Sequence, residues 1–270
     1  MDSMTNDDRG QIAHSAAEVY EEFFVPALFG DWPDRVLDAA DVGPGHRVLD
    51  VACGTGVLAR AASRLVGEGG KVVGLDPNEG MLEVARRLDS AIVWHSGIAE
   101  DLPFEDASFD RVVSQFGMMF FTDREAAVEE MARVLAPGGV LGLATWASLD
   151  ETPGYAAMVD LLAELFDDET ANALRAPYVM GDPDEVGRLI SKVFTNTTVT
   201  RHHGVARFDS IEAWLHTDIR GWTLSDKIDD EQYAILLSEG RRRLNQFTDK
   251  HGKVTFPAPA LISVGTRELQ

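Results

Sequence analysis

The sequence predicts an α/β protein built on a doubly wound sheet of seven strands, the last of them antiparallel, with a helical cap. Between residues 47 and 146, short apolar runs alternate with amphipathic segments of helical spacing, as in strands joined by crossover helices. A glycine-rich turn follows the first apolar run. After residue 148 the alternation gives way to successive amphipathic helices, which predict the cap.

The central stretch is RVLDVACGTGVLAR, residues 47–60. Its apolar start predicts a buried strand, and the helical spacing of its end predicts the first helix of the core. Gly54 and Gly56 allow a sharp turn and a close approach of the backbone to a ligand. Together with Ala59 they fit the general nucleotide-binding fingerprint, in which small residues open a helix after a strand.

Asp50 makes the expected ligand more specific. It lies four residues before Gly54, at the end of the predicted strand. A dinucleotide would place its pyrophosphate at this helix N-terminus, and a carboxylate beside it would repel that group. The same carboxylate suits a ligand that carries an ammonium group, such as the methionine end of S-adenosylmethionine.

Four blocks in order resemble the class I S-adenosylmethionine-dependent methyltransferases: VLDVACGTG, VVGLDPNEGMLEVAR, SGIAEDLPFEDASFDRVVSQFGMMFF and RVLAPGGVLGLATW. The resemblance covers residues 47–146, and the rest of the chain is only loosely similar. It implies a Rossmann-like sheet, S-adenosylmethionine as cofactor and methyl transfer to a small acceptor. The chain is similar to the broad group of methyltransferases that act on quinones, sterols, lipids and secondary metabolites.

Asp76 is the predicted ribose ligand. It ends the second predicted strand, 20 residues after Gly56, where an acidic side chain takes the ribose hydroxyls of an adenosine. The alternative is a helix cap near Asn78. The resemblance implies that Met81 packs against the adenine. Many relatives carry an Asp at the position of Ile98, so this departure leaves the partner of the adenine amino group open.

Further ligand contacts follow from the ends of other elements. Tyr20 and Trp32 are candidates for a lid on the N-terminal helices, with ordinary core packing as the alternative. Gln115 is expected beside the transferable methyl, because it ends the fourth strand. The complete set of predicted cofactor-binding residues is Tyr20, Trp32, Asp50, Ala52, Gly54, Gly56, Asp76, Pro77, Met81, Ala99, Glu100 and Gln115.

The segment after Gln115 predicts part of an acceptor pocket. Phe116 is expected beside the methyl group, and Met118, Met119, Phe120 and Phe121 could form an apolar wall. The alternative is that this cluster packs the next helix on the sheet.

The same patterns divide the chain into lid, core and cap, with the cap made from two insertions. The predicted boundaries are 1–46 for the N-terminal lid helices, 47–148 for the S-adenosylmethionine-binding core, 149–182 for the first cap insertion, 183–208 for a core helix and strand, 209–252 for the second cap insertion and 253–270 for the closing strand of the core.

Composition restricts the partners. The 270 residues carry a net charge of −21, which repels nucleic acid and anionic lipid, although acidic surfaces also occur in halophilic proteins. No apolar run is long enough to span a membrane, and the N-terminus lacks a secretion signal. The lone Cys53 fits a reducing compartment, so we expect a cytoplasmic protein. A homo-oligomer is compatible with the sequence, but nothing in it indicates one.

Catalytic residues cannot be assigned from the sequence. Displacement from a sulfonium needs positioning more than a nucleophile on the protein. His14, His202, His203 and His216 are candidates for a general base, with surface or packing roles as the alternative. No spacing resembles a metal site. Two other functions stay open, a non-catalytic cofactor-binding protein and a nicotinamide-dependent oxidoreductase, although Asp50 argues against the second.

Overall fold

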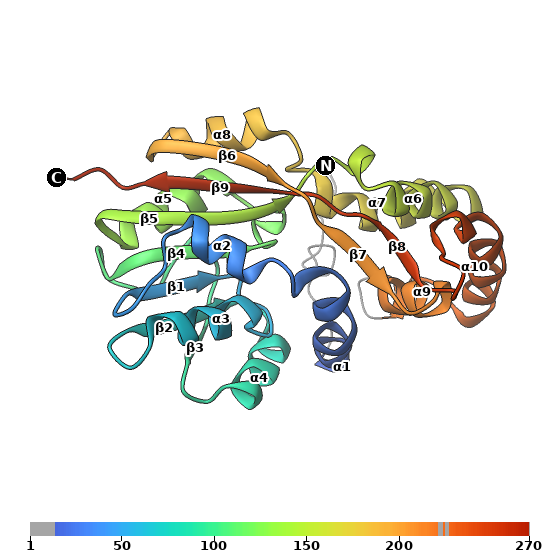
Figure 1. Cartoon of the computed structure of the whole chain (residues 1–270), viewed down its shortest axis with the longest axis horizontal. Helices are drawn as coiled ribbons and strands as arrows, with labels where there is room; N and C mark the ends of the chain where they lie inside the picture. The colour runs from blue at the N-terminus through green and yellow to red at the C-terminus, as the bar shows by residue number, and fades with distance from the viewer. Residues whose placement is uncertain (1–13, 221–223, 225–226, 270) are drawn as a thin grey trace.

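The computed structural model describes residues 14–220, 224 and 227–269, so the first 13 residues of the predicted lid region lie outside it. The described chain forms one seven-stranded sheet in the order β3-β2-β1-β4-β5-β9-β6 (Figure 1). The strands are β1 (Arg47–Val51), β2 (Lys71–Asp76), β3 (Val93–Ser96), β4 (Phe109–Gln115), β5 (Leu135–Trp146), β6 (Thr195–His202) and β9 (Ala260–Thr266).

The direction of the strands confirms the predicted fold class. The pairs from β3 to β5 are all parallel, whereas β9 lies antiparallel between β5 and β6. Strand β1 is central and has four buried residues after Arg47, as expected for a strand covered on both faces. The order reverses between β1 and β4, which in doubly wound sheets is the point where ligands bind.

Five helices flank the sheet. They are α2 (Pro33–Ala39), α3 (Val57–Val66), α4 (Glu79–Leu88), α5 (Arg124–Val134) and α8 (Pro183–Ser191). Helix α2 packs against α3, and α5 packs against α8, so each pair shares a face of the sheet. Three of these five helices begin with a side-chain cap, in which Asn78, Asp123 and Asp182 accept bonds from first-turn amides.

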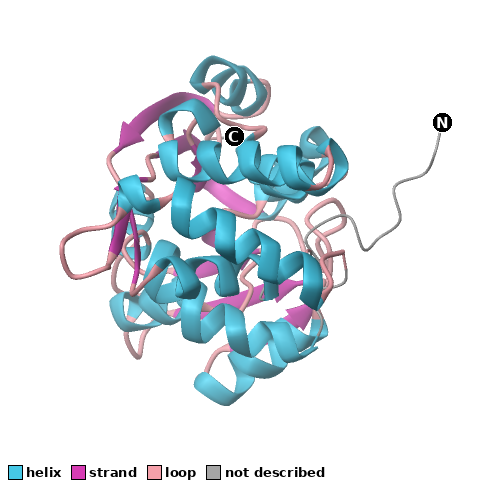
Figure 2. Cartoon of the chain, turned by 90° about the vertical axis from the view of Figure 1, so that its right-hand side faces the viewer, coloured by secondary structure: helices cyan, strands magenta, loops and turns pink. Residues whose placement is uncertain are grey.

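A helical cap lies beyond the carboxyl ends of the parallel strands, at the right of Figure 1 and facing the viewer in Figure 2. It consists of α6 (Pro153–Leu165), α7 (Asp168–Arg175), α9 (Ile211–Arg220) and α10 (Asp230–Arg243). Helix α6 contacts both α7 and α10, so the two segments that contribute helices pack together. No helix among the described residues is long and apolar enough to cross a membrane.

A small second sheet joins the cap to the main sheet, and the sequence patterns did not predict it. Its strands are β7 (Val205–Phe208) and β8 (Val254–Pro257), which lie in the segments expected to form a core helix and strand (183–208) and the closing strand (253–270). The chain leaves the main sheet at Gly204. A Cβ at this glycine would lie 2.2 Å from the carbonyl oxygen of Ala258 and 2.3 Å from the Trp32 ring, so only glycine fits.

The N-terminal segment lies against the core. Helix α1 (His14–Val19) continues as a π-helical stretch, Tyr20–Phe29, and α1 packs on α4. Four short 3₁₀ helices complete the described elements: Met118–Phe120, Leu149–Glu151, Ala176–Tyr178 and Asn245–Phe247.

Gly56 ends the glycine turn in a left-handed conformation, with φ of 87°, and α3 begins directly after it. A Cβ here would lie 2.3 Å from the Trp94 ring, which also lies over Gly74. Trp94 is fixed by a bond from its indole N–H to the carbonyl oxygen of Asp89, 2.8 Å long. The turn is therefore shaped to accept an indole from β3, which lies beyond β2 in the sheet.

We expect Gly56→Ala to lower the free energy of unfolding by roughly 2–4 kcal/mol, because it adds left-handed backbone strain and overpacking against Trp94. Gly45→Ala is the matched control, since Gly45 has φ of 81° but open space around its Cα. Its cost should be about 1–2 kcal/mol, from strain alone. The free energies of unfolding are measured by denaturant titration. An equal decrease in the two variants would show that overpacking against Trp94 adds nothing to the cost at Gly56.

Candidate functional site

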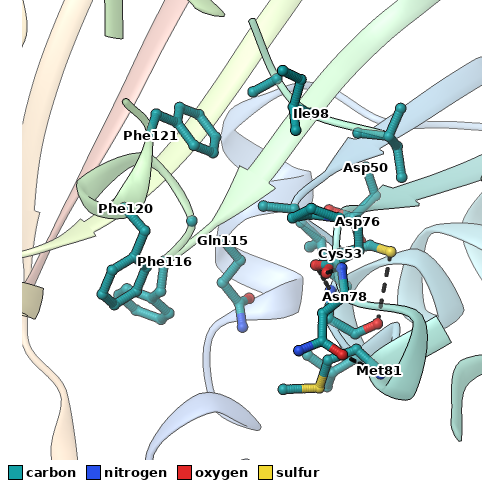
Figure 3. A pocket seen from close by; sticks show the side chains of 18 of the residues that line it. Asp50, Cys53, Asp76, Asn78, Met81, Ile98, Gln115, Phe116, Phe120 and Phe121 are labelled. Atoms are coloured by element: carbon teal, nitrogen blue, oxygen red, sulfur yellow. Dashed lines mark hydrogen bonds between the residues drawn. The ribbon is translucent and has the colours of Figure 1, made fainter. Parts of the chain in front are cut away.

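A cavity of about 230 Å³ opens at the carboxyl ends of β1, β2 and β4 (Figure 3). Figure 3 shows Asp50 and Asp76 on one side and Phe116 and Phe120 on the other. Ten of the twelve predicted cofactor-binding residues line it: Tyr20, Asp50, Ala52, Gly54, Asp76, Pro77, Met81, Ala99, Glu100 and Gln115. The structure thus brings these ten residues together at one cavity, and their contacts with a cofactor stay a prediction.

Asp50 is a buried carboxylate without a compensating charge. Its side chain is 1 % exposed, and neither carboxylate oxygen has a hydrogen-bond partner among the described residues. Burial raises the pKa of Asp50 well above its usual value, against the weaker effect of the Ala59 amide, and the charge of Asp76 adds to the rise. Such a group is costly unless a cation or donor completes it.

Asp76 ties β2 to the glycine turn. Its Oδ2 accepts a bond of 2.8 Å from the Gly54 amide, and its Oδ1 accepts one of 2.8 Å from the Asn78 amide. The N-cap of α4 is Asn78 itself, which accepts from the Met81 amide. Burial raises the pKa of Asp76 to about 6, although both amides act to lower it. Each oxygen retains a lone pair for a ligand hydroxyl.

Two predicted residues do not line the cavity. Trp32 is 1 % exposed and packs edge-on against Phe116 and Trp146, with ring centroids 5.6 and 5.9 Å away. It lies in the core, which matches the packing alternative for this residue. Gly56 faces Trp94 instead of the cavity, so it shapes the turn from behind.

Tyr20 covers the glycine turn from the N-terminal segment. A Cβ placed on Gly54 would lie 4.0 Å from its ring, and that ring stacks on Phe29 with centroids 5.2 Å apart. Next to Tyr20, the carboxylate of Glu21 accepts from Arg60 on α3 at 2.6 Å. The N-terminal segment is thus held over the turn by an aromatic stack and an ion pair.

The residues expected at the adenine edge lie together. Ile98 and Ala99 both line the cavity. Ile98 is 49 % exposed, whereas Ala99 is buried. Glu100 uses Oε1 to accept from the amides of Thr122 and Asp123, at 2.6 and 3.2 Å. Its orientation is therefore fixed by the backbone that precedes α5.

Gln115 and Phe116 lie where β4 ends. The Gln115 amide donates to the carbonyl oxygen of Phe29 at 3.2 Å, and its buried Oε1 has no partner among the described residues. Phe116 has φ of 58° and Ala52 has φ of 57°, so two non-glycine residues at the cavity adopt left-handed conformations. Such strain is common at functional sites. The ring of Phe116 stacks on Trp146 at 3.9 Å.

The predicted apolar wall is divided by the structure. Phe120 and Phe121 line the cavity, whereas Met118 and Met119 are buried in the core. The side-chain pattern alone could not separate these two roles, because all four residues are apolar.

A second cavity of about 60 Å³ adjoins the first, and Tyr20, Phe116 and Phe120 line both. It contains the buried carboxylate of Asp218 from α9, which the sequence analysis missed. A signal was present, because Asp218 lies four residues after the buried Trp214 on the apolar side of its helix.

The histidine candidates lie elsewhere. His202, His203 and His216 do not line either cavity, and the side chain of His14 lies outside the described residues. Cys53 lines the first cavity, but burial raises the pKa of its thiol well above the usual value, as the charges of Asp76 and Asp50 also do. No group of three or more His, Cys, Asp or Glu in the described part of the chain could hold a metal ion.

Comparison with known proteins links this geometry to a family. Residues 48–139 match a family model described as a methyltransferase domain. A ubiquinone/menaquinone biosynthesis C-methyltransferase of Cronobacter sakazakii is 40% identical over 140 residues, which cover 48% of this chain and 56% of the relative. A similar protein from Laribacter hongkongensis is 40% identical over 146 residues, covering 50% and 60%. The chain thus spans little more than half the length of these curated relatives.

Solved structures resemble the chain over more of its length but at low identity. A putative methyltransferase from an antibiotic biosynthesis pathway of Anabaena variabilis has a TM-score of 0.63 and 19% identity, covering 85% of this chain and 95% of that protein. A likeness at this identity shows the fold alone.

Proposed function

We propose that this chain, which belongs through residues 48–139 to the class I S-adenosylmethionine-dependent methyltransferases, transfers the cofactor's methyl group to a small, partly apolar acceptor. The predicted family, with S-adenosylmethionine as its cofactor, is confirmed by the domain match and the curated relatives. The acceptor and the activity of the whole protein belong to the proposal.

The unpartnered carboxylate of Asp50 carries the proposal. It lies at the ligand-binding edge of the sheet, beside the glycine turn, and no described residue neutralises it. An ammonium group supplies the missing positive charge and donors, whereas a pyrophosphate would add repulsion. The methionine end of S-adenosylmethionine carries such an ammonium, so the residues present fit this cofactor.

The remaining wall fits an adenosine. We assign the ribose hydroxyls to Asp76, whose two oxygens are held in place by the Gly54 and Asn78 amides. The adenine would lie between Met81 and the edge formed by Ala99 and Glu100. Gln115, with its unpartnered Oε1, would lie close to the sulfonium. Bound S-adenosylmethionine supplies an activated methyl group, and the chain's own task is to orient the acceptor and exclude water.

Orientation and closure account for the chemistry that the site can perform. Holding a nucleophile in line with the reacting carbon contributes roughly 7–11 kcal/mol to lowering a barrier. Tyr20 and the aromatic residues around Phe116 exclude water from the reacting end of the cavity. No protein nucleophile is required. The comparisons give no support to the oxidoreductase alternative.

The surroundings of the enzyme belong to the same proposal. A net charge of −21 disfavours nucleic acid and anionic membrane surfaces as partners. We therefore propose a cytoplasmic enzyme that acts on a small molecule.

Calorimetric titration with S-adenosylhomocysteine, with NAD in parallel, tests the proposal. Binding of S-adenosylhomocysteine without binding of NAD is expected, because the Asp50 carboxylate attracts an ammonium and repels a pyrophosphate. Binding of NAD alone, or of neither compound, would overturn the proposed function.

The affinity for S-adenosylhomocysteine should depend on pH through Asp76. The pKa of the Asp76 carboxyl is raised to about 6. In the unliganded protein the carboxyl is therefore mostly protonated below pH 6 and mostly ionised above it. The ribose diol needs the ionised acceptor. We therefore expect Kd to rise as the pH falls through about 6, by up to about tenfold per pH unit.

Asp76→Asn is the control for this titration, because it removes the charge and keeps the shape of the side chain. Its affinity should be lower at neutral pH and should lack the Asp76 contribution to the pH dependence. An unchanged affinity and an unchanged pH profile would contradict the ribose assignment.

A further inference from the structure

The second cavity adjoins the end of the first cavity where Phe116 follows β4. It shares the side chains of Tyr20, Phe116 and Phe120 with the cofactor cavity, so the two spaces meet across these rings. Its remaining wall comes from the N-terminal stretch Tyr20–Phe29, from the cap region and from Trp146 at the end of β5. The cap thus supplies what the core does not, a separate compartment next to the reacting end of the proposed cofactor site.

Aromatic rings dominate this compartment. Eight of the twelve described residues that line it are Phe, Tyr or Trp. Trp146 and Tyr178 have ring centroids 6.5 Å apart, and Tyr155 and Tyr178 have centroids 6.0 Å apart. Ring faces carry partial negative charge and attract cations, which are held most strongly where water is excluded.

One carboxylate completes the compartment. Asp218 is 2 % exposed and accepts bonds of 3.0 and 3.2 Å from the Tyr155 hydroxyl. No Lys, Arg or His is among the described residues that line the cavity. Aromatic rings around a buried acid, with no cation among the described lining residues, form a site that suits a positive ligand.

The size of the compartment separates two classes of acceptor. A cavity that holds benzene measures about 150 Å³, whereas this one measures about 60 Å³. The space suits an amine with one or two small substituents and is too small for an aromatic ring.

We propose, on the basis of the proposed methyl transfer, that this compartment binds the amino group of a small aliphatic amine, that Asp218 accepts its proton, and that nitrogen is the atom methylated. The proton passes from the ammonium nitrogen to a carboxylate oxygen of Asp218. The freed lone pair forms the N–C bond while the C–S bond of the sulfonium breaks, and that bond's electron pair stays on sulfur. The proton on Asp218 then leaves to water.

The local environment suits this proton transfer. Burial raises the pKa of Asp218 to about 8, against the effect of the hydrogen bond from the Tyr155 hydroxyl and of the nearby Trp214 indole. With this pKa Asp218 is largely protonated at neutral pH in the unliganded protein, and a bound ammonium favours its ionised form. An aliphatic ammonium such as that of lysine has a pKa of about 10.4, so the ionised Asp218 is a better proton acceptor for it than an ordinary aspartate. The other titratable groups in the cavity are Tyr20, Tyr155 and Tyr178. Their hydroxyls are uncharged at neutral pH, because burial raises the pKa of each.

The test compares N-methylethanolamine with 2-methoxyethanol, which has the same shape but an ether oxygen in place of the amine. Both are titrated into the full chain by calorimetry, with and without S-adenosylhomocysteine. We expect the amine to bind at least tenfold more tightly than the ether. Equal affinities, or tighter binding of hydroquinone than of the amine, would overturn the proposal.

Asp218→Asn should reduce the affinity for the amine at least tenfold and leave the affinity for the ether unchanged. Asp160→Asn is the matched control, because Asp160 is an exposed carboxylate on α6. It should change neither affinity. An Asp218→Asn protein that binds S-adenosylhomocysteine normally and retains amine affinity would contradict the proposal.

These arms separate the two claims. If the unaltered protein does not bind S-adenosylhomocysteine, the proposed function is wrong, even if the amine still binds to its compartment. Normal S-adenosylhomocysteine binding without preference for the amine would remove only the assignment of the acceptor.

Discussion

The contact on which the site depends is the hydrogen bond from the Gly54 amide to the carboxylate of Asp76, 2.8 Å long. It joins the glycine turn after β1 to the end of β2, so two neighbouring strands present their carboxyl ends as one surface. Trp94 supports the same turn from behind by filling the space that Gly56 and Gly74 leave open. The turn is therefore fixed on both sides before any ligand arrives, and Asp50 is held beneath it.

This fixed geometry creates an electrostatic demand. Two buried carboxylates lie in one cavity, and the charge of Asp76 raises the pKa of Asp50 further. The free energy lost by burying two carboxylates can be offset by the binding of a ligand that pairs with them. Acids with perturbed pKa values of this kind concentrate at functional sites. The cap repeats the arrangement on a smaller scale, since Asp218 is also buried and its pKa is also raised. Both compartments are thus suited to positively charged groups.

The core could be predicted from the sequence because its signals are local. Each core strand is indicated by its own apolar run. The glycine turn and the acid that ends β2 are themselves the residues that line the predicted ligand site. The surroundings of Trp32, Gly56 and Asp218 could not be predicted in this way, because they come from distant segments, although helical spacing indicated that Asp218 lies on the apolar side of its helix. Trp32 packs against Trp146, Gly56 faces a ring from β3, and Asp218 meets Tyr155 across the cap. The small β7–β8 sheet likewise depends on pairing between segments some 50 residues apart.

The central claim is that Asp50 selects a ligand by its ammonium group. The most direct measurement compares the affinities of the unaltered protein and Asp50→Asn for S-adenosylhomocysteine and for 5′-methylthioadenosine, which lacks the amino-acid end. The account predicts that the substitution weakens S-adenosylhomocysteine at least tenfold and leaves methylthioadenosine unchanged. Equal loss of both ligands, or no loss of either, would contradict it.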